Sequence, residues 1–433
     1  MLGVLRVPNF RLLWIGQSIS LLGDQFYLIA LPWLALRLTH DPLTMGAVLA
    51  AEGVPRALFM LVGGALTDRF SARTLMLVSD LLRLVLVGLL AVLVFNGQIQ
   101  VWMLFAFALI FGLVDAFAYP AWAAIVPELV GPDQLQAGNS VIQGTARLSV
   151  FIGPALAGAL IALLDRQPVI IPGAPAPVPD LQGIGLAFGI DALSYLASAS
   201  TLWLMKVAGQ TTQSGPNESV LASIRSGLLI VWSDVVLRTL LLLVAAVNLL
   251  IVGPFMIGVP VLADTRLAGG AAAYGIIISA YGGGSLVGIV LAGVLPKPAP
   301  QRQGLVMLLL TGALGIGLIL LNFASSTPTV AAIALMMGLA SGYVAILFVT
   351  WVQIRTPEAM LGRMMGFMMF AAVGLVPVSN ALAGALIALH PTLLFVGAGS
   401  LVILLALLAS RIPAIRNMGQ EQDRTAIDAA ESG

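Results

Sequence analysis

Acidic and basic residues lie inside the long apolar segments of this chain, and they are the residues that could do chemistry there. A charge at the centre of a bilayer costs about 2.5–3.5 kcal/mol on insertion scales, so such residues usually face a protein interior and have a role. A carboxyl group in this setting can bind and release a proton. The charged residues well inside the predicted spans are Asp24, Glu52, Arg56, Asp80, Arg83, Asp115, Arg147 and Asp191.

Asp24 is the strongest candidate for proton binding. It lies about halfway along the predicted span 11–36, no cation follows or precedes it within one helical turn, and Pro32 can bend the helix beyond it. Low-dielectric surroundings favour the uncharged form of a carboxyl group. We therefore predict that Asp24 couples transport to protons, with Glu52 as a second candidate and Arg147 as the distant counter-charge. The alternative is a hydrogen-bonded structural aspartate.

The other acids have partners within reach along the sequence. Glu52 and Arg56 are i,i+4 neighbours and Asp80 and Arg83 are i,i+3 neighbours, so each pair can partly neutralise itself. The second pair is expected near the cytoplasmic end of its span, as a clamp.

Two further acids lie in the fourth and sixth spans. For Asp115 we predict a salt bridge to Arg73, with substrate contact as the alternative. Asp191, next to Ser194 and Tyr195, fits both an outer gate and a polar packing group.

The composition identifies the class of protein that positions these residues. Of 433 residues, 60% are hydrophobic and 9% are charged, and the mean hydropathy is +1.05. Soluble domains carry roughly 25% charged residues. The sequence therefore predicts an all-α polytopic membrane protein.

Several function classes find no support in the sequence. The net charge of +1 gives no reason to expect nucleic acid as a partner. There is no phosphate-binding Gly-x4-Gly-Lys-Ser/Thr loop and no cysteine, and the two histidines lie in predicted turns. We expect no enzyme activity, no metal and no cofactor, with a proton gradient as the energy source.

A transmembrane helix needs about 20 apolar residues, and the sequence contains twelve such segments. Fourteen Lys and Arg residues fall on one side of them and three on the other, which predicts that both termini are cytoplasmic in an inner or plasma membrane. The predicted spans are 11–36, 43–66, 74–95, 101–122, 139–164, 184–205, 236–262, 272–295, 303–323, 328–352, 364–389 and 392–411.

An internal repeat divides the chain. The octapeptide at 155–162 recurs unchanged at 381–388, and Trp122 and Trp351 lie 229 residues apart in a matching context. This predicts two pseudo-symmetric six-helix bundles, the arrangement in which substrate sites form between repeats and access alternates. The expected parts are a bundle at 1–205, a cytoplasmic linker with an interfacial helix at 206–235, a bundle at 236–412 and a disordered tail at 413–433.

The two predicted bundles differ in polarity. Spans of the second half carry amides such as Asn248 and Asn380 but essentially no central charge, so ion coupling is expected in the first half. The second half offers an apolar wall for a substrate, in which Asn248 is a candidate polar contact and methionines at 364–369 give an adaptable surface.

Two motifs resemble those of a known family. The loop 64–73, with Gly64, Leu66, Asp68, Arg69 and Arg73, resembles the signature loop between helices 2 and 3 of the major facilitator superfamily. A second motif, formed by Gly144, Gly153, Pro154 and Gly158, resembles the glycine motif of the antiporter branch of this family. The segments around 120–140 and 191–195 resemble the macrolide-efflux and siderophore-exporter-like members.

The resemblance implies a twelve-helix secondary transporter that acts as a monomer. It would export an amphipathic or apolar small molecule in exchange for protons by alternating access. The signature loop, with Asp80, Arg83 and Asp115, would form a cytoplasmic gate. The alternatives are a lipid or lysolipid flippase, and a membrane receptor or assembly protein that transports nothing.

Overall fold

A computed structural model of the chain describes residues 2–67, 70–164, 181–206, 232, 235–296, 298–356, 364, 368–412 and 415. Several predictions fall outside these residues. They concern Asp68, Arg69, most of the linker 206–235 and nearly all of the tail 413–433. Gly64 and Leu66 lie on a described helix, but their side chains are outside the description.

The described residues form helices and turns, and no strand is found among them. The elements are η1 (Leu2–Arg6), α1 (Pro8–Thr39), α2 (Pro42–Thr67), α3 (Ala72–Phe95), α4 (Val101–Leu129), α5 (Pro132–Leu164), α6 (Gln182–Leu204), α8 (Val235–Thr265), α9 (Ala271–Val294), α10 (Pro300–Phe323), α11 (Thr327–Arg355), α13 (Val376–Leu389), η2 (Leu393–Gly397) and α14 (Ala398–Ser410).

Eleven helical segments in the described part of the chain are long and apolar enough to cross a membrane. The remaining predicted span, 43–66, corresponds to α2, a 26-residue helix that carries Glu52 and Arg56. The predicted all-helical class is therefore confirmed.

Two predicted spans differ from the structure. The fifth helix begins at Pro132 rather than at 139, because a proline suits the first turn, where its missing N–H is not needed. The predicted span 364–389 is interrupted by a turn at Gly374 and Leu375. Pro377, at the start of α13, has no N–H to continue the preceding helix.

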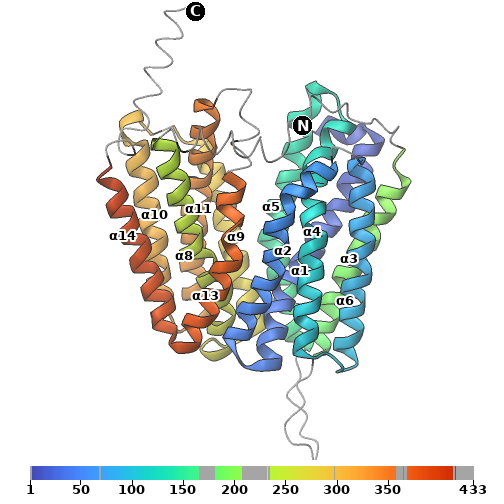
Figure 1. Cartoon of the computed structure of the whole chain (residues 1–433), viewed down its shortest axis with the longest axis horizontal. Coiled ribbons are helices and arrows are strands. Elements are labelled where there is room, and N and C mark those ends of the chain that lie inside the picture. The colour runs from blue at the N-terminus through green and yellow to red at the C-terminus, as the bar shows by residue number, and fades with distance from the viewer. Residues whose placement is uncertain are drawn as a thin grey trace, which may run out of the picture. The chain divides into compact units, whose positions relative to one another are not determined.

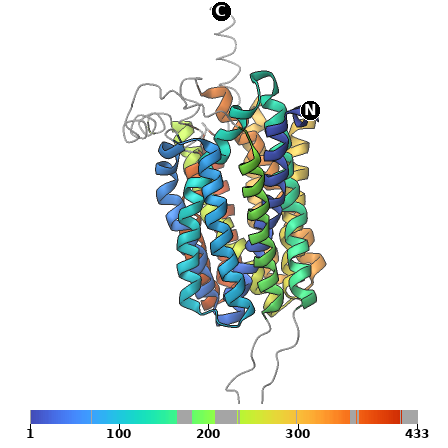
Figure 2. The ribbon, with the colours of Figure 1, turned by 90° about the vertical axis from the view of Figure 1, so that its right-hand side faces the viewer.

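The described residues divide into two compact units. Unit 1 comprises Met1–Asn217 and Val259–Ser279, and unit 2 comprises Glu218–Gly258 and Ala280–Gly433. In unit 1, α4 packs against α2 and α3, and α6 packs against α1 and α3 (Figure 1). Figure 2, drawn from the side of α3 and α6, shows these two helices next to each other.

Unit 2 is held together by close approaches of small residues. A Cβ atom on Gly284 or Gly288 of α9 would lie 2.0–2.2 Å from backbone oxygens of α11, and Gly338 and Gly342 of α11 approach α9 equally closely. These two Gly-x3-Gly pairs let the backbones of α9 and α11 touch, as in many membrane helix pairs. At another contact, the Gly253 N–H of α8 donates to Ser379 Oγ of α13 at 2.7 Å.

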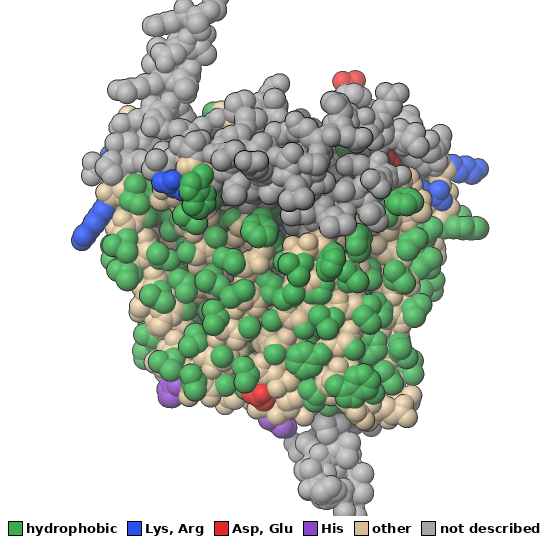
Figure 3. Space-filling view, viewed as in Figure 1, with side chains coloured by type: hydrophobic (Ala, Val, Ile, Leu, Met, Phe, Trp, Pro, Cys, Tyr) green, Lys and Arg blue, Asp and Glu red, His purple; other side chains and the backbone are tan. Residues whose placement is uncertain are grey.

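The helix sides carry mostly hydrophobic side chains, whereas charged side chains gather near the helix ends (Figure 3). On the face shown, Lys and Arg lie toward one end of the helices and His toward the other. This surface suits a lipid environment.

Candidate functional site

Asp24 lies inside unit 1, near the middle of α1. Its carboxyl Oδ1 accepts a hydrogen bond from the Tyr195 hydroxyl of α6 at 2.7 Å. Asp191, one turn before Tyr195, is completely buried, and its Oδ2 has no hydrogen-bond partner. A Cβ atom on Gly23 would lie 2.9 Å from Asp191 Oδ1, so the small residue at 23 lets α6 bring its carboxyl group beside Asp24.

An ionic network joins α2, α3 and α4. The Arg56 guanidinium bonds to Glu52 Oε1 at 2.5 Å and to Asp115 Oδ2 at 2.8 Å. Arg83 pairs with the other oxygen, Oδ1, of Asp115. Asp115 therefore bridges two arginines that come from different helices, and both arginine side chains are mostly buried.

Aromatic rings surround the Arg83 end of this network. The guanidinium carbon of Arg83 lies 5.5 Å from the ring centres of both Phe111 and Tyr195, within the range of cation–π attraction. Tyr27 stacks on Phe111, with ring centres 4.4 Å apart and planes inclined by 13°. Tyr195 thus connects the arginine network with Asp24.

A second polar chain lies between α1, α3 and α6. Gln17 donates to Ser198 Oγ at 3.1 Å, and Ser198 is hydrogen-bonded to the Asp80 carboxyl group. Asp80 is buried, and its Oδ2 has no partner. Asp80 therefore resembles Asp191 in having one carboxyl oxygen without a hydrogen bond.

The charged residues described above form one group, which we call the acid-rich cluster. Its seven members are Asp24, Glu52, Arg56, Asp80, Arg83, Asp115 and Asp191. The cluster holds five carboxyl groups and two guanidinium groups. If every group were charged, three negative charges would be uncompensated in a buried region, which is strongly unfavourable. The cluster is therefore chemically suited to hold protons or to receive a cationic group.

Two predicted pairings around the arginines are wrong. Asp80 and Arg83 do not form a clamp at the helix end, because Arg83 lies at the middle of the 24-residue α3 and makes its ion pair with Asp115, although its charge also acts on Asp80. Arg147 is not the counter-charge of Asp24. Its side chain is exposed on α5, whereas Arg83 and Arg56 interact electrostatically with Asp24.

The predicted salt bridge between Arg73 and Asp115 is also wrong. Arg73, near the start of α3, donates from Nε to Leu202 O at 2.7 Å and from a terminal nitrogen to Trp203 O at 2.9 Å. These carbonyls belong to the last turn of α6, where a cation satisfies free backbone acceptors. Arg73 therefore ties α3 to α6, whereas Asp115 lies near the middle of α4.

The residues of the glycine motif differ in their surroundings. A Cβ atom on Gly158 would lie 2.4 Å from Ala271 O and 2.9 Å from Gly275 Cα, and Gly275 in turn faces Pro154 O. The Ala155 N–H, which follows Pro154 in α5, donates to Ser279 Oγ at 2.8 Å. Gly153 faces the Gln25 side chain, and Gly144 has open space around it.

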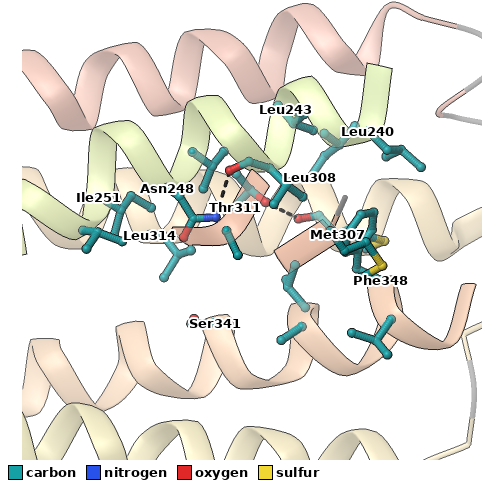
Figure 4. Close-up of a pocket in the computed structure, with 18 of the residues that line it drawn as sticks. Leu240, Leu243, Asn248, Ile251, Met307, Leu308, Thr311, Leu314, Ser341 and Phe348 are labelled. Carbon is teal, nitrogen blue, oxygen red and sulfur yellow. Dashed lines mark hydrogen bonds between the residues drawn. The ribbon is translucent and has the colours of Figure 1, made fainter. Parts of the chain in front are cut away.

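Unit 2 contains a cavity of about 310 Å³, shown in Figure 4. Asn248 lies on its wall, on α8, as a polar residue among apolar ones. We call it the α8–α11 cavity, after two of the helices that line it. Its other lining residues with polar side chains are Tyr281, Thr311 and Ser341.

Several site residues could not be selected from the sequence. In the sequence, Tyr195 is distinguished only as a neighbour of Asp191, and Tyr27 and Phe111 resemble other aromatic residues of a membrane span. Their one common signal is proximity along a helix to a charged residue: Tyr27 follows Asp24 and Phe111 precedes Asp115 by about one turn. Thr311 and Ser341 carry no such signal, because isolated hydroxyls are common in transmembrane helices.

Comparison with known proteins gives relatives along most of the chain. It is 26% identical over 408 residues to the multidrug efflux pump Tap of Mycolicibacterium fortuitum, covering 92% of this chain and 93% of the relative. It is 28% identical over 370 residues to the enterobactin exporter EntS of Escherichia coli, with 83% and 80% covered. A shorter match, 25% over 162 residues, joins it to macrolide efflux protein A of Streptococcus pyogenes and covers 37% and 40%.

The fold is also that of solved transporters. A crystal structure of the peptide transporter POT in complex with sulfate superimposes with a TM-score of 0.67 at 15% identity, over 94% of this chain and 95% of that one. The model of the Major Facilitator Superfamily matches residues 13–378. The chain therefore belongs to the Major Facilitator Superfamily.

Proposed function

We propose that this protein is a proton-coupled exporter of small amphipathic or apolar molecules. Membership of a transporter family and the named efflux relatives support the export of small molecules. Proton coupling, alternating access and the placement of both termini in the cytoplasm are the finer parts of the proposal.

The observation that carries the proton-coupling proposal is the excess of carboxyl groups in the acid-rich cluster. Five acids share two arginines, and two of the acids have a buried carboxyl oxygen without a partner. A carboxyl group held in this way is stabilised by a bound proton. We assign the exchange of this proton to Asp24, since the contacts of Tyr195 connect Asp24 with Arg83 and hence with helices α3 and α4.

Protonation of Asp24 would change the contacts of Tyr195 and Arg83. When Asp24 is ionised, the Tyr195 hydroxyl and the positive charge of Arg83 stabilise it. When Asp24 is protonated, Arg83 is bound mainly by Asp115. The proton therefore changes the forces between α1, α3, α4 and α6, and such a change can bias one conformation over another.

Reconstituted protein in liposomes tests the proposal. Uptake of dyes, macrolides, siderophores and lysolipids into inverted vesicles is measured with and without an imposed pH gradient, with empty liposomes as the control. The proposal predicts gradient-driven accumulation of one or more drug-like compounds. Movement of lysolipids alone would favour the flippase alternative, and absence of any transport would favour the receptor alternative.

A further inference from the structure

The α8–α11 cavity takes the place of the ionic network in the internal repeat. Tyr281 and Val344, both in its lining, lie 229 residues after Glu52 and Asp115. Phe348, also in the lining, lies 229 residues after Tyr119. Two positions that carry paired charges in unit 1 therefore carry uncharged side chains beside open space in unit 2.

No charged side chain lines the cavity, as far as its described lining shows. Most of the wall is aliphatic or aromatic, with Leu240, Ile251, Leu314 and Phe348 as examples (Figure 4). Its volume of about 310 Å³ is at the lower end of the range of small-molecule sites. Such a lining discriminates against an ion, because a charge buried there would have no partner.

Few polar side chains line the cavity, and they differ in whether they can accept a hydrogen bond from a ligand. The Asn248 amide nitrogen donates to Val244 O at 2.9 Å, and among the described residues no hydrogen bond to its Oδ1 is found. The Thr311 hydroxyl donates to Met307 O at 2.8 Å. Both bonds appear as dashed lines in Figure 4, where Ser341 lies across the cavity from Asn248.

We propose that the α8–α11 cavity binds an uncharged, mostly apolar molecule that carries a hydrogen-bond donor, with Asn248 Oδ1 as the acceptor. This deepens the export function above by naming a substrate class, and it rests on that function only for the direction in which the ligand moves. Met368 lies in the wall, and its unbranched side chain can adjust to ligands of different shape. Recognition of the ligand and binding of the proton are thereby assigned to different units.

Binding of N-phenyl-1-naphthylamine tests the proposal. This probe is uncharged, has two aromatic groups and one N–H donor, and fluoresces more strongly in apolar surroundings. The full chain is placed in lipid nanodiscs, and the probe is titrated against loaded and empty discs. We expect a saturable signal with one site per chain only in the loaded discs.

Variants locate the site. Ala345→Phe and Ser341→Leu fill the cavity and should each weaken binding about tenfold. Asn248→Leu should weaken it severalfold. The matched control Ala332→Phe adds the same side chain on the exposed surface of α11 and should bind as the wild type does.

A second readout protects the test against misfolded variants. The probe should raise the apparent Tm of the wild type and of Ala332→Phe, but not that of Ala345→Phe or Ser341→Leu. Wild-type affinity in both filled variants, or no difference between loaded and empty discs, would overturn the cavity proposal. Normal probe binding without pH-driven transport would instead refute proton coupling and leave the cavity proposal intact.

Discussion

The hydroxyl group of Tyr195 on α6 donates a hydrogen bond of 2.7 Å to the Asp24 carboxyl group on α1. The same ring lies against the Arg83 guanidinium, 5.5 Å from its centre. One tyrosine thus connects the candidate proton site with the arginine network that joins three helices of unit 1.

Replacing Tyr195 with Phe should weaken both transport and stability. The ring stays in place, but the buried Asp24 carboxyl group loses its donor, which costs about 1–3 kcal/mol. Apparent Tm in detergent and pH-driven transport are the measurements. Tyr119→Phe is the matched control, since Tyr119 is exposed on α4. Equal behaviour of the two variants would show that the Tyr195 hydroxyl is not needed.

The arginine network predicts a non-additive result. Arg83→Leu leaves Asp115 and Glu52 sharing one arginine, and breaking a buried pair in this way costs about 3–5 kcal/mol. Arg83→Leu combined with Asp115→Leu leaves the balanced pair Glu52 and Arg56, so the double variant should be more stable than Arg83→Leu alone. Unfolding by heat or denaturant measures both.

Double-mutant cycles can also test which arginine is the partner of Asp115. A double-mutant cycle between Arg73 and Asp115 should give a coupling energy below about 0.5 kcal/mol, as for residues without a shared contact. The cycle between Arg83 and Asp115 should give a clearly larger value. A strong coupling to Arg73 would restore the salt bridge that the sequence pattern suggested.

The close approach of α5 to α9 within unit 1 predicts different costs for two similar substitutions. Gly158→Ala places a methyl group against the Ala271 carbonyl and the Gly275 backbone, and overpacking of this kind costs about 1–3 kcal/mol. Gly144→Ala adds the same group where no atom lies within 4 Å. We expect the first to lower Tm and the second to leave it unchanged or raise it slightly. Similar Tm values would contradict the packing described here.

The hydrogen bonds of Asp41, which lies outside the membrane spans, should make a pH-dependent contribution to stability. It precedes α2 and accepts from the Thr44 hydroxyl at 2.6 Å and from the backbone N–H groups of Leu43 and Thr44. These hydrogen bonds, above all the one from the Thr44 hydroxyl, lower the pKa of Asp41 below its usual value of 3.8. The stabilisation is therefore fully present above the unfolded-state pKa and is lost as the pH falls through the lower, folded-state value.

Asp41→Ala should accordingly lower stability by about 1 kcal/mol at neutral pH, the usual loss for a helix N-cap. The difference from the wild type should shrink below about pH 4. Asp264→Ala, at an exposed acid near the end of α8, is the control. A difference that stays constant down to pH 3 would exclude the capping role.

The class of fold could be predicted from the sequence because hydropathy and length almost determine a transmembrane helix. Helix ends were less certain, since Pro132 can start a helix as easily as interrupt one. The buried acids were also recognisable, because a charge in an apolar span is rare. Their partners were not, since Arg83 and Asp115 are 32 residues apart and only the packing of α3 on α4 brings them together. The cavity of unit 2 depends on the shapes of many ordinary apolar side chains, which no motif records.

The most direct test compares two kinds of transport by Asp24→Asn in proteoliposomes. Wild-type protein should accumulate substrate against its gradient when a pH gradient is imposed, and should also exchange labelled for unlabelled substrate without one. Asp24→Asn should keep the exchange, which shows that it is folded and binds substrate, but should lose the accumulation. Full uphill transport by Asp24→Asn would contradict the assignment of proton coupling to Asp24.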